Sequence, residues 1–234
     1  YINNDIAVRT ENKLTYAPQL LKFGKDWLEE EYFEGTPINR VESPSKVKEH
    51  LENIFEYHFK TLNLKNLKSF KKNDYVDLVN TEIESITTNN KIKVDQCLIE
   101  EIKNVFSLLF SVLNNKDIKV SWTHGDFQQA NILIAKGISK VIDWEASEKR
   151  FYMYDAFTLF SRIREGETIS DAILNFREAV GPIDYVKEVD ENTITLLLIE
   201  ELRFNVNETF SVNFFESGTQ TESLCNAITT YIDE

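Results

Sequence analysis

The chain has 234 residues, of which 42% are hydrophobic and 12% aromatic, enough to bury one large core or two smaller ones. Its 39 acidic and 26 basic side chains give a formal net charge of −13, which repels nucleic-acid phosphates and anionic membrane surfaces. No apolar run reaches the roughly 18 residues of a membrane helix, and the first residues lack a signal-peptide pattern. We therefore expect a soluble protein of a reducing cytoplasm.

The amino-terminal part is predicted to hold short strands and then a helix. Residues 14–33 have a β-like pattern, with Trp27–Phe33 as the best strand, and Gly35-Thr36-Pro37 ends it. Ser43 and Pro44 form an N-cap signal with proline in the first turn, so a helix of about four turns should follow.

The middle of the chain contains two weak segments and one strong helix. Residues 60–72 are polar and predict a loop or a short irregular helix, and apolar spacing resumes only weakly in residues 75–86. Residues 94–113 carry a broad apolar face, wider than a helix packed on one side needs, and are predicted to form the central helix.

The last half of the chain predicts a β segment and then several helices. Residues 119–122 are strand-like, and residues 132–134 and 138–142 form a β-hairpin around Lys136-Gly137. Helical spacing follows in four segments: residues 154–163, 170–180, 192–210 and 219–232.

The cysteines and two of the histidines give no metal-site or disulfide signal. Cys97 and Cys225 lie far apart and outside any metal-ligand spacing. His50 and His58 lie about two helical turns apart, not one turn apart as zinc ligands often are. We expect ordinary structural roles for all four side chains.

Three oxygen-bearing side chains bracket the predicted hairpin. Asn131 precedes its first strand and Asp143 follows its second, so the closing of the hairpin should bring them together. Such oxygens suit magnesium, which prefers few carboxylates together with phosphates and water. Asp126 lies on the loop before Asn131 and can orient and deprotonate an attacking hydroxyl. Singly, such residues more often cap turns or end strands, but their joint spacing favours chemistry.

Two motifs resemble those of a known family. Residues 124–131, His-Gly-Asp-Phe-Gln-Gln-Ala-Asn, and residues 142–144, Ile-Asp-Trp, are similar to the catalytic-loop and metal motifs of the aminoglycoside phosphotransferase and choline kinase family. Protein kinases have His-Arg-Asp-x-x-x-x-Asn and Asp-Phe-Gly at the corresponding places. The resemblance implies an α+β, protein-kinase-like fold. Residues 1–35 would be a remnant of the β-rich N-terminal lobe with its hinge, and residues 36–234 the mostly helical C-terminal lobe.

The resemblance also implies a role for each motif residue. Asp126 would be the catalytic base, and Asn131 and Asp143 would hold magnesium. His124 and Gly125 would shape the loop, and Asp155, which resembles the family's aspartate after the metal motif, would be structural support.

An adenine site is implied on two segments. The backbone of Glu31, Tyr32 and Phe33 would bind the adenine edge at the hinge, where the alternative is a plain exposed strand end. Leu133 and Ile142 would form the apolar floor, where ordinary hairpin core is an almost equal alternative.

Two departures from the family pattern limit the prediction. Gln128-Gln129-Ala130 replaces the usual His-Pro-Gly, which weakens any phosphate contact there. The residues before the hinge contain no Gly-x-Gly, and Lys13, Lys22 and Lys25 lie too near the hinge to be the phosphate-gripping lysine. We expect most of the N-terminal lobe to lie upstream, and this chain alone to be weakly active or inactive.

The predicted activity is magnesium-dependent transfer of phosphate from ATP, or GTP in its place, to a hydroxyl of a small molecule. Aminoglycosides, choline-like amine alcohols and sugars are the candidate acceptors. Acidic side chains of the helical part would suit an amine, although they are more often a solvated face: Glu165, Glu167, Glu200, Glu201 and Glu208. A non-catalytic nucleotide- or protein-binding module is the alternative. A magnesium-dependent phosphohydrolase is a weaker one, because such sites use more carboxylates.

Overall fold

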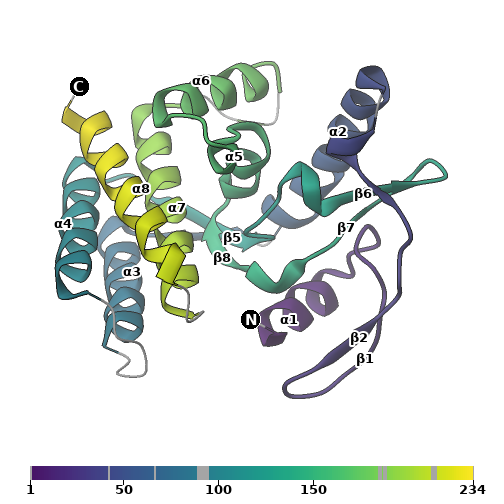
Figure 1. Cartoon of the computed structure of the whole chain (residues 1–234), viewed down its shortest axis with the longest axis horizontal. Helices are drawn as coiled ribbons and strands as arrows, with labels where there is room; N and C mark the ends of the chain where they lie inside the picture. The colour runs from purple at the N-terminus through teal and green to yellow at the C-terminus, as the bar shows by residue number, and fades with distance from the viewer. Residues whose placement is uncertain are drawn as a thin grey trace. The chain divides into compact units, whose positions relative to one another are not determined.

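A computed structural model of the chain shows a mostly helical α+β protein with small antiparallel sheets (Figure 1). It forms two compact units, one of Tyr1–Lys68 with Val120–Phe160 and one of Ser69–Lys119 with Ser161–Glu234. The sequence-based boundary at residue 35 stays a prediction. The structure describes residues 2–41, 43–65, 67–88, 95–183, 186, 189–211 and 215–233.

The first unit begins with a helix that the sequence did not predict, α1 (Ile2–Asn12). Its buried side chains are mostly polar, and Arg9 bonds to Asp5 at 2.5 Å and to Glu30 at 2.6 Å. A two-stranded antiparallel sheet follows, made of β1 (Leu20–Phe23) and β2 (Leu28–Glu30). The predicted strand Trp27–Phe33 is therefore too long.

The predicted four-turn helix is confirmed as α2 (Pro44–His58), with Ser43 at the N-cap and proline in the first turn. Its apolar face is buried in the first unit, with Phe55 at 1% exposure. The chain then continues as a π-helical turn, η2 (Phe59–Asn63), inside the segment expected to be a loop or irregular helix. The short strand β4 (Lys68–Phe70), which the sequence did not predict, follows.

The predicted hairpin is confirmed as β6 (Ile132–Ala135) and β7 (Ile138–Val141). Its turn places Lys136 at φ 50° and Gly137 at φ 78°. Two successive positive φ angles are the requirement of a tight hairpin turn. The two-residue strand β3 (Thr36–Pro37) pairs with β6 and joins the hinge segment to the hairpin.

Two further strands flank the hairpin in the chain. The predicted strand at residues 119–122 is confirmed as β5 (Ile118–Thr123), whose last four residues pair with β8 (Glu148–Phe151). The short helix η4 (Trp144–Ala146) lies between the hairpin and β8, and α5 (Tyr154–Phe160) ends this unit. Strand β8 was not predicted.

The second unit is a group of helices packed around α7 (Glu191–Ser211), which contacts α3, α4 and α8. The bounds of the others are α3 (Lys72–Thr87), α4 (Gln96–Val112), α6 (Ile169–Val180) and α8 (Phe215–Asp233), with the short helix η5 at Ile163–Glu165. Each predicted helix is present. The prediction that residues 94–113 form the central helix is wrong, because α4 leaves one face exposed whereas α7 is buried on most sides. Val94 lies outside the described residues.

No helix in the described part of the chain combines the length and the apolar character that crossing a membrane requires. Both cysteines are free, with Cys97 exposed and Cys225 buried.

Candidate functional site

The loop after β5 is held by a buried carboxylate at the start of α5, that of Asp155. Its Oδ2 accepts hydrogen bonds from the backbone N–H of His124 at 2.8 Å, from Nε2 of His58 at 2.8 Å and from Nδ2 of Asn63 at 2.9 Å. Its Oδ1 accepts one from the backbone N–H of Gly125 at 3.0 Å. Side chains from α2, η2 and α5 thereby fix the backbone of the loop.

Asp155 and His124 in this network both have pKa values below those of the free side chains. Burial alone would raise the pKa of Asp155, but the hydrogen bond and charge of His58, together with His124 and Asn63, lower it to about 2. Burial lowers the pKa of His124 to about 4. The loop is therefore anchored by an ionised carboxylate and a neutral imidazole at neutral pH.

Gly125 can only be glycine at this place. Its φ is +85°, and a Cβ atom there would lie 2.2 Å from the backbone oxygen of Ala146. Both the left-handed backbone and the close approach exclude a side chain. The loop therefore turns tightly against η4 immediately before Asp126.

Asp126 accepts hydrogen bonds from two side-chain amides. Nε2 of Gln128 lies 3.1 Å from its Oδ1 and 3.0 Å from its Oδ2, and Nδ2 of Asn131 lies 2.8 Å from Oδ2. The Asn131 amide also donates to the Asp126 backbone oxygen at 2.9 Å. Both hydrogen bonds of the Asn131 side chain run through Nδ2, and no described residue donates one to its Oδ1.

The closed hairpin brings Asn131 next to Asp143. Ile132 pairs with Val141, and the N–H of Ile142 donates to the backbone oxygen of Asn131 at 2.9 Å. The carbonyl of Ile142 in turn lies 2.9 Å from Nε2 of the His124 ring. The geometry thus gathers the three predicted site residues, while their roles stay predictions.

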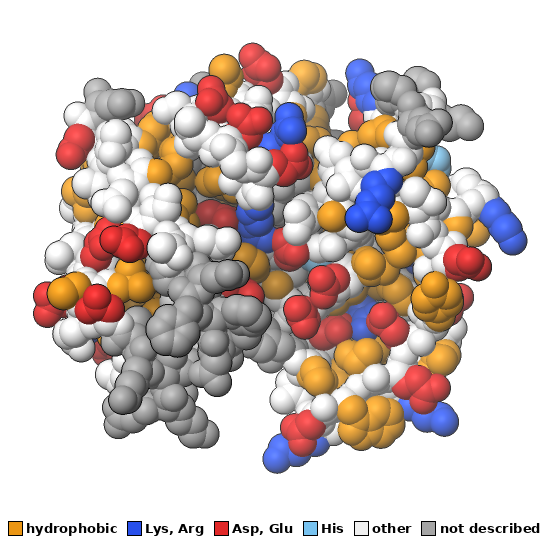
Figure 2. Space-filling model, in the orientation of Figure 1, with side chains coloured by type: hydrophobic (Ala, Val, Ile, Leu, Met, Phe, Trp, Pro, Cys, Tyr) orange, Lys and Arg blue, Asp and Glu red, His pale blue; other side chains and the backbone are white. Residues whose placement is uncertain are grey.

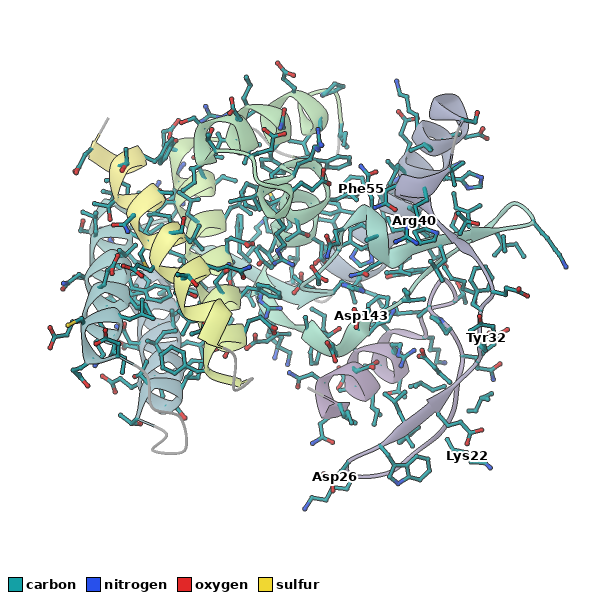
Figure 3. All side chains as sticks on the ribbon, in the orientation of Figure 1. Lys22, Asp26, Tyr32, Arg40, Phe55 and Asp143 are labelled. Atoms are coloured by element: carbon teal, nitrogen blue, oxygen red, sulfur yellow. The ribbon has the colours of Figure 1, made fainter. Side chains whose placement is uncertain are left out.

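Asp143 is an exposed carboxylate in an acidic surrounding. Its neighbours still remove part of the water around the carboxylate, and this desolvation, with the nearby carboxylates of Glu145, Asp126, Asp5 and Glu30, raises its pKa to about 6. Figure 3 shows Asp143 beside α1, and Figure 2 shows several acidic side chains on the viewed face near α1 and η4. We call these five side chains the acidic rim. Arg9 already pairs with Asp5 and Glu30, and a second cation would relieve the repulsion among Asp143, Glu145 and Asp126.

The donor set of the rim fits magnesium. Asp143 offers a carboxylate, and Asn131, which lies beside the rim, offers an amide oxygen to which no described residue donates a hydrogen bond. Mg²⁺ is usually held by one or two carboxylates, with waters and substrate phosphates completing the shell. The part of the chain that the structure describes has no group of three or more His, Cys, Asp or Glu side chains arranged for a metal. A magnesium site of one carboxylate and one amide oxygen does not require such a group of three.

The predicted adenine-binding residues lie at the joint between the hinge segment and the hairpin. The N–H of Glu31 donates to the backbone oxygen of Gln19 at 2.8 Å, so it is not available to a base. The Tyr32 side chain is 87% exposed and points away from the unit (Figure 3). A Cβ on Gly35 would lie 2.9 Å from both Leu133 and Phe33. The hinge backbone thus packs directly on the half-buried Leu133.

Solved structures that share this fold include small-molecule kinases. Aminoglycoside phosphotransferase APH(4)-Ia superposes with a TM-score of 0.62 at 13% identity over 97% of this chain and 81% of its own. A choline/ethanolamine kinase family protein from Mesorhizobium loti gives 0.55 at 16% identity over 97% and 79%. A glucosamine kinase gives 0.53 at 12% identity over 99% and 73%.

The chain has the kinase-like fold of the aminoglycoside phosphotransferase and choline kinase family. At these identities the likeness extends to the fold alone. The sequence matches no protein-family profile. It also has no significant match among curated proteins.

Sequence reasoning missed several residues that build this candidate site. His58 and Asn63 anchor Asp155, although His58 was expected to be an ordinary structural residue. The signal was its position three residues after Phe55, on the apolar face of α2. Asp5 and Glu30 were missed because their part in the rim depends on contacts far apart in sequence.

Proposed function

We propose that the chain transfers the terminal phosphate of ATP to a hydroxyl group of a small molecule, with magnesium as cofactor. The observation that carries the proposal is the convergence of Asp126, Asn131 and Asp143 at the open end of the hairpin, where its first strand begins and its second strand ends, with the loop before it fixed by buried Asp155. The fold supports it, since the structural relatives include an aminoglycoside phosphotransferase in complex with ADP and hygromycin B and a glucosamine kinase in complex with glucosamine and ADP.

Each residue has a positioning task in this reaction. Asp126 accepts the proton of the attacking hydroxyl and orients its oxygen. Asn131 holds the Asp126 carboxylate with its Nδ2 and presents Oδ1 to the metal, which Asp143 also binds. Magnesium, when bound, neutralises charge on the phosphates. The backbone of Glu31, Tyr32 and Phe33 borders the adenine, with Leu133 and Ile142 beneath it.

The test is Asp126→Asn in the full chain. Asparagine keeps an oxygen for the Gln128 and Asn131 amides, so the loop should stay folded. We expect turnover to fall about 10²- to 10⁴-fold with little change in nucleotide affinity. ADP release is measured with hygromycin B, choline and glucosamine as acceptors, and Asp26→Asn, an exposed carboxylate in the turn between β1 and β2, is the matched control. Near-native turnover by Asp126→Asn would refute the role of Asp126 as the catalytic base.

A non-catalytic nucleotide-binding module is the second candidate, and one observation favours it. The Gln128 amide contacts both oxygens of Asp126 and competes with a substrate hydroxyl for them. Calorimetry distinguishes the two functions. Magnesium-dependent ATP binding without ADP release on any acceptor would support the module, and Gln128→Ala would then be the variant in which to look for recovered turnover.

A further inference from the structure

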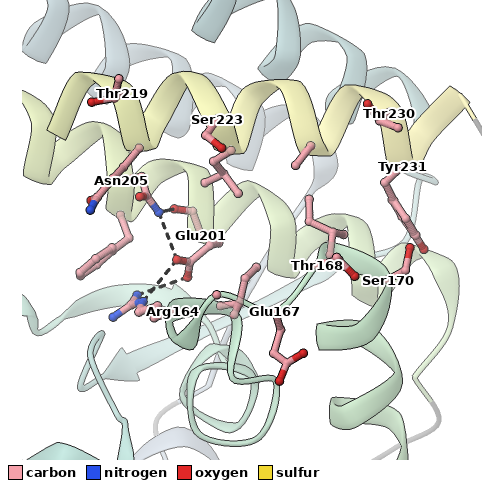
Figure 4. A pocket seen from close by; sticks show the side chains of 17 residues that line it. Arg164, Glu167, Thr168, Ser170, Glu201, Asn205, Thr219, Ser223, Thr230 and Tyr231 are labelled. Atoms are coloured by element: carbon pink, nitrogen blue, oxygen red, sulfur yellow. Dashed lines mark hydrogen bonds and ion pairs between the residues drawn. The ribbon is translucent and has the colours of Figure 1, made fainter. Parts of the chain in front are cut away.

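Buried polar groups of the second unit have partners within the unit, as the wall of its large cavity shows. This cavity has a volume of about 970 Å³ and lies between η5, α6, α7 and α8 (Figure 4). Nε and Nη2 of Arg164 lie 3.3 and 3.2 Å from the two carboxylate oxygens of Glu201, and Nδ2 of Asn205 donates to Glu201 at 3.1 Å. Such pairing is the rule for buried polar atoms, so a buried atom without a partner calls for a physical reason.

One such atom lies in the first unit, on the ring of His58 at the end of α2. The side chain is fully buried, and its Nδ1 has no hydrogen-bond partner among the described residues. Its Nε2 lies 2.8 Å from Oδ2 of Asp155. Because Asp155 is ionised at neutral pH, its oxygen accepts the hydrogen bond and Nε2 of His58 carries the proton. An apolar ring would fill the same space without an unpartnered nitrogen, so the imidazole indicates that the bond to Asp155 matters.

The face of the same ring packs on the loop that carries Asp126. The rings of His58 and Phe127 are stacked, with their centroids 4.0 Å apart and an interplanar angle of 10°. Phe127 is fully buried and follows Asp126 directly. On the other side of Asp126, the backbone N–H groups of the two preceding residues donate to Asp155, the carboxylate that His58 binds. His58 therefore holds both flanks of Asp126, one through a ring stack and the other through Asp155.

Two further rings enclose the imidazole within the first unit. The centroid of the Tyr16 ring lies 5.5 Å from that of His58, and the centroid of Trp144, the residue after Asp143, lies 6.0 Å away. The bond to Asp155 is the one side-chain hydrogen bond that His58 makes with a described residue. A side chain of another shape at residue 58 therefore has to displace the loop or one of these rings.

We propose that His58 is a positioning residue for the catalytic base, which it holds from both flanks without touching a substrate. A displacement of Asp126 by about 1 Å can lower turnover by about 10²-fold, because the reacting hydroxyl and the base must be aligned. The inference rests on the proposed function for the role of Asp126, but the position of the loop can also be measured without catalysis.

Two substitutions separate the two contacts of the ring. His58→Gln keeps an N–H that can reach Asp155 and removes the ring, whereas His58→Phe keeps a ring for the stack and removes the N–H. We expect kcat for ADP release to fall about tenfold in His58→Gln and about 10²-fold in His58→Phe, which leaves a buried carboxylate short of a donor. The KM for ATP should change by less than about twofold in both, because neither contact involves the nucleotide.

Phe55→Leu is the matched control for lost packing. Phe55 is buried on the same helix, and its ring neighbours are Phe59 and Phe160 rather than residues of the loop. This variant should lose stability in urea unfolding while it keeps kcat. Unchanged kcat in both His58 variants, or a loss of kcat in Phe55→Leu as large as theirs, would overturn the proposal.

NMR of the loop tests the proposal independently of phosphate transfer. The amide protons of His124 and Gly125 donate to Asp155, so their chemical shifts should change in His58→Phe and stay near the wild-type values in Phe55→Leu. The nitrogen spectrum of the wild-type His58 ring should show the proton on Nε2. A ring protonated on Nδ1 alone, or unchanged amide shifts in His58→Phe, would contradict the positioning role. Absence of turnover together with the expected shifts would refute the proposed function and support the positioning of the loop by His58.

Discussion

A buried acid of the helical unit and the exposed acid after the hairpin differ in what compensates their charge. Glu200 is fully buried, with Nη1 of Arg203 at 2.6 Å and the hydroxyl of Tyr75 at 2.7 Å. Asp143 is exposed, and every charged group that shifts its pKa is another carboxylate. The ion pair of Glu200 with arginine is part of the packed core of the helices. Asp143, which lies among other carboxylates at the surface, is instead suited to bind a cation from solution.

Removing an arginine from the helical unit should have the largest effect on stability. Arg203→Met leaves Glu200 buried without its cation, which typically costs about 3–5 kcal/mol. Arg162→Met is the matched control, because Arg162 pairs with the exposed Glu165 and should change stability by less than about 0.5 kcal/mol. Urea unfolding measures both. Equal losses in the two variants would contradict the structural role of the buried pair.

Asp155 is a third kind of acid, compensated by hydrogen bonds. Asp155→Asn replaces one acceptor oxygen by an NH₂ group that faces the donors of His58, His124 or Gly125. We expect a loss of about 2–3 kcal/mol, the cost of leaving buried donors unsatisfied. Chemical denaturation checks it against Asp26→Asn, which should have no effect. A loss no larger than that of the control would show that the network does not fix the loop.

The same network predicts the response to acid. His124 has a folded pKa of about 4 against 6.5 for a free ring, so the unfolded chain binds more protons and stability falls as the pH drops from 6.5 to 4. Asp155, with its pKa lowered from 3.8 to about 2, adds a further loss below pH 3.8. The raised pKa of Asp143 acts with the opposite sign.

We expect the His124 contribution to be on the order of 3 kcal/mol. Thermal unfolding between pH 7 and 4 measures it. His124→Gln should flatten the dependence, and His50→Gln, which changes a half-buried histidine outside this network, should not. Flattening by both variants, or by neither, would refute the assignment to His124.

The hairpin and its site residues could be predicted because they depend on local rules. Lys136-Gly137 between two apolar runs specifies a tight turn, and the register of such a turn places Asn131 and Asp143 together. The helices of the second unit could be predicted because their apolar residues repeat with helical spacing.

The remaining features depend on contacts between distant residues that no local pattern contains. Helix α1 was missed because its buried residues include Asp5, Arg9 and Asn12, which periodicity assigns to the surface. The central position of α7 was missed for the same reason, since the buried Glu200 and Arg203 look like a solvated face in sequence. Ion pairs with other residues of the chain allow these polar side chains to be buried in the core.

Asp143→Asn should have the smallest effect on stability of these variants, and it distinguishes the rim from the buried acids most directly. Asp143→Asn should stabilise the metal-free chain slightly, by less than about 1 kcal/mol, because it removes one of several like charges from a solvent-screened edge. Asparagine is the suitable replacement, since residue 143 has φ 65° and asparagine tolerates that conformation. Thermal unfolding with and without millimolar MgCl₂ should show stabilisation by magnesium in the wild type and much less in Asp143→Asn, with Asp26→Asn behaving as the wild type. Equal magnesium responses in all three proteins, or a destabilised Asp143→Asn, would place Asp143 with the structural acids and remove the metal site from the proposal.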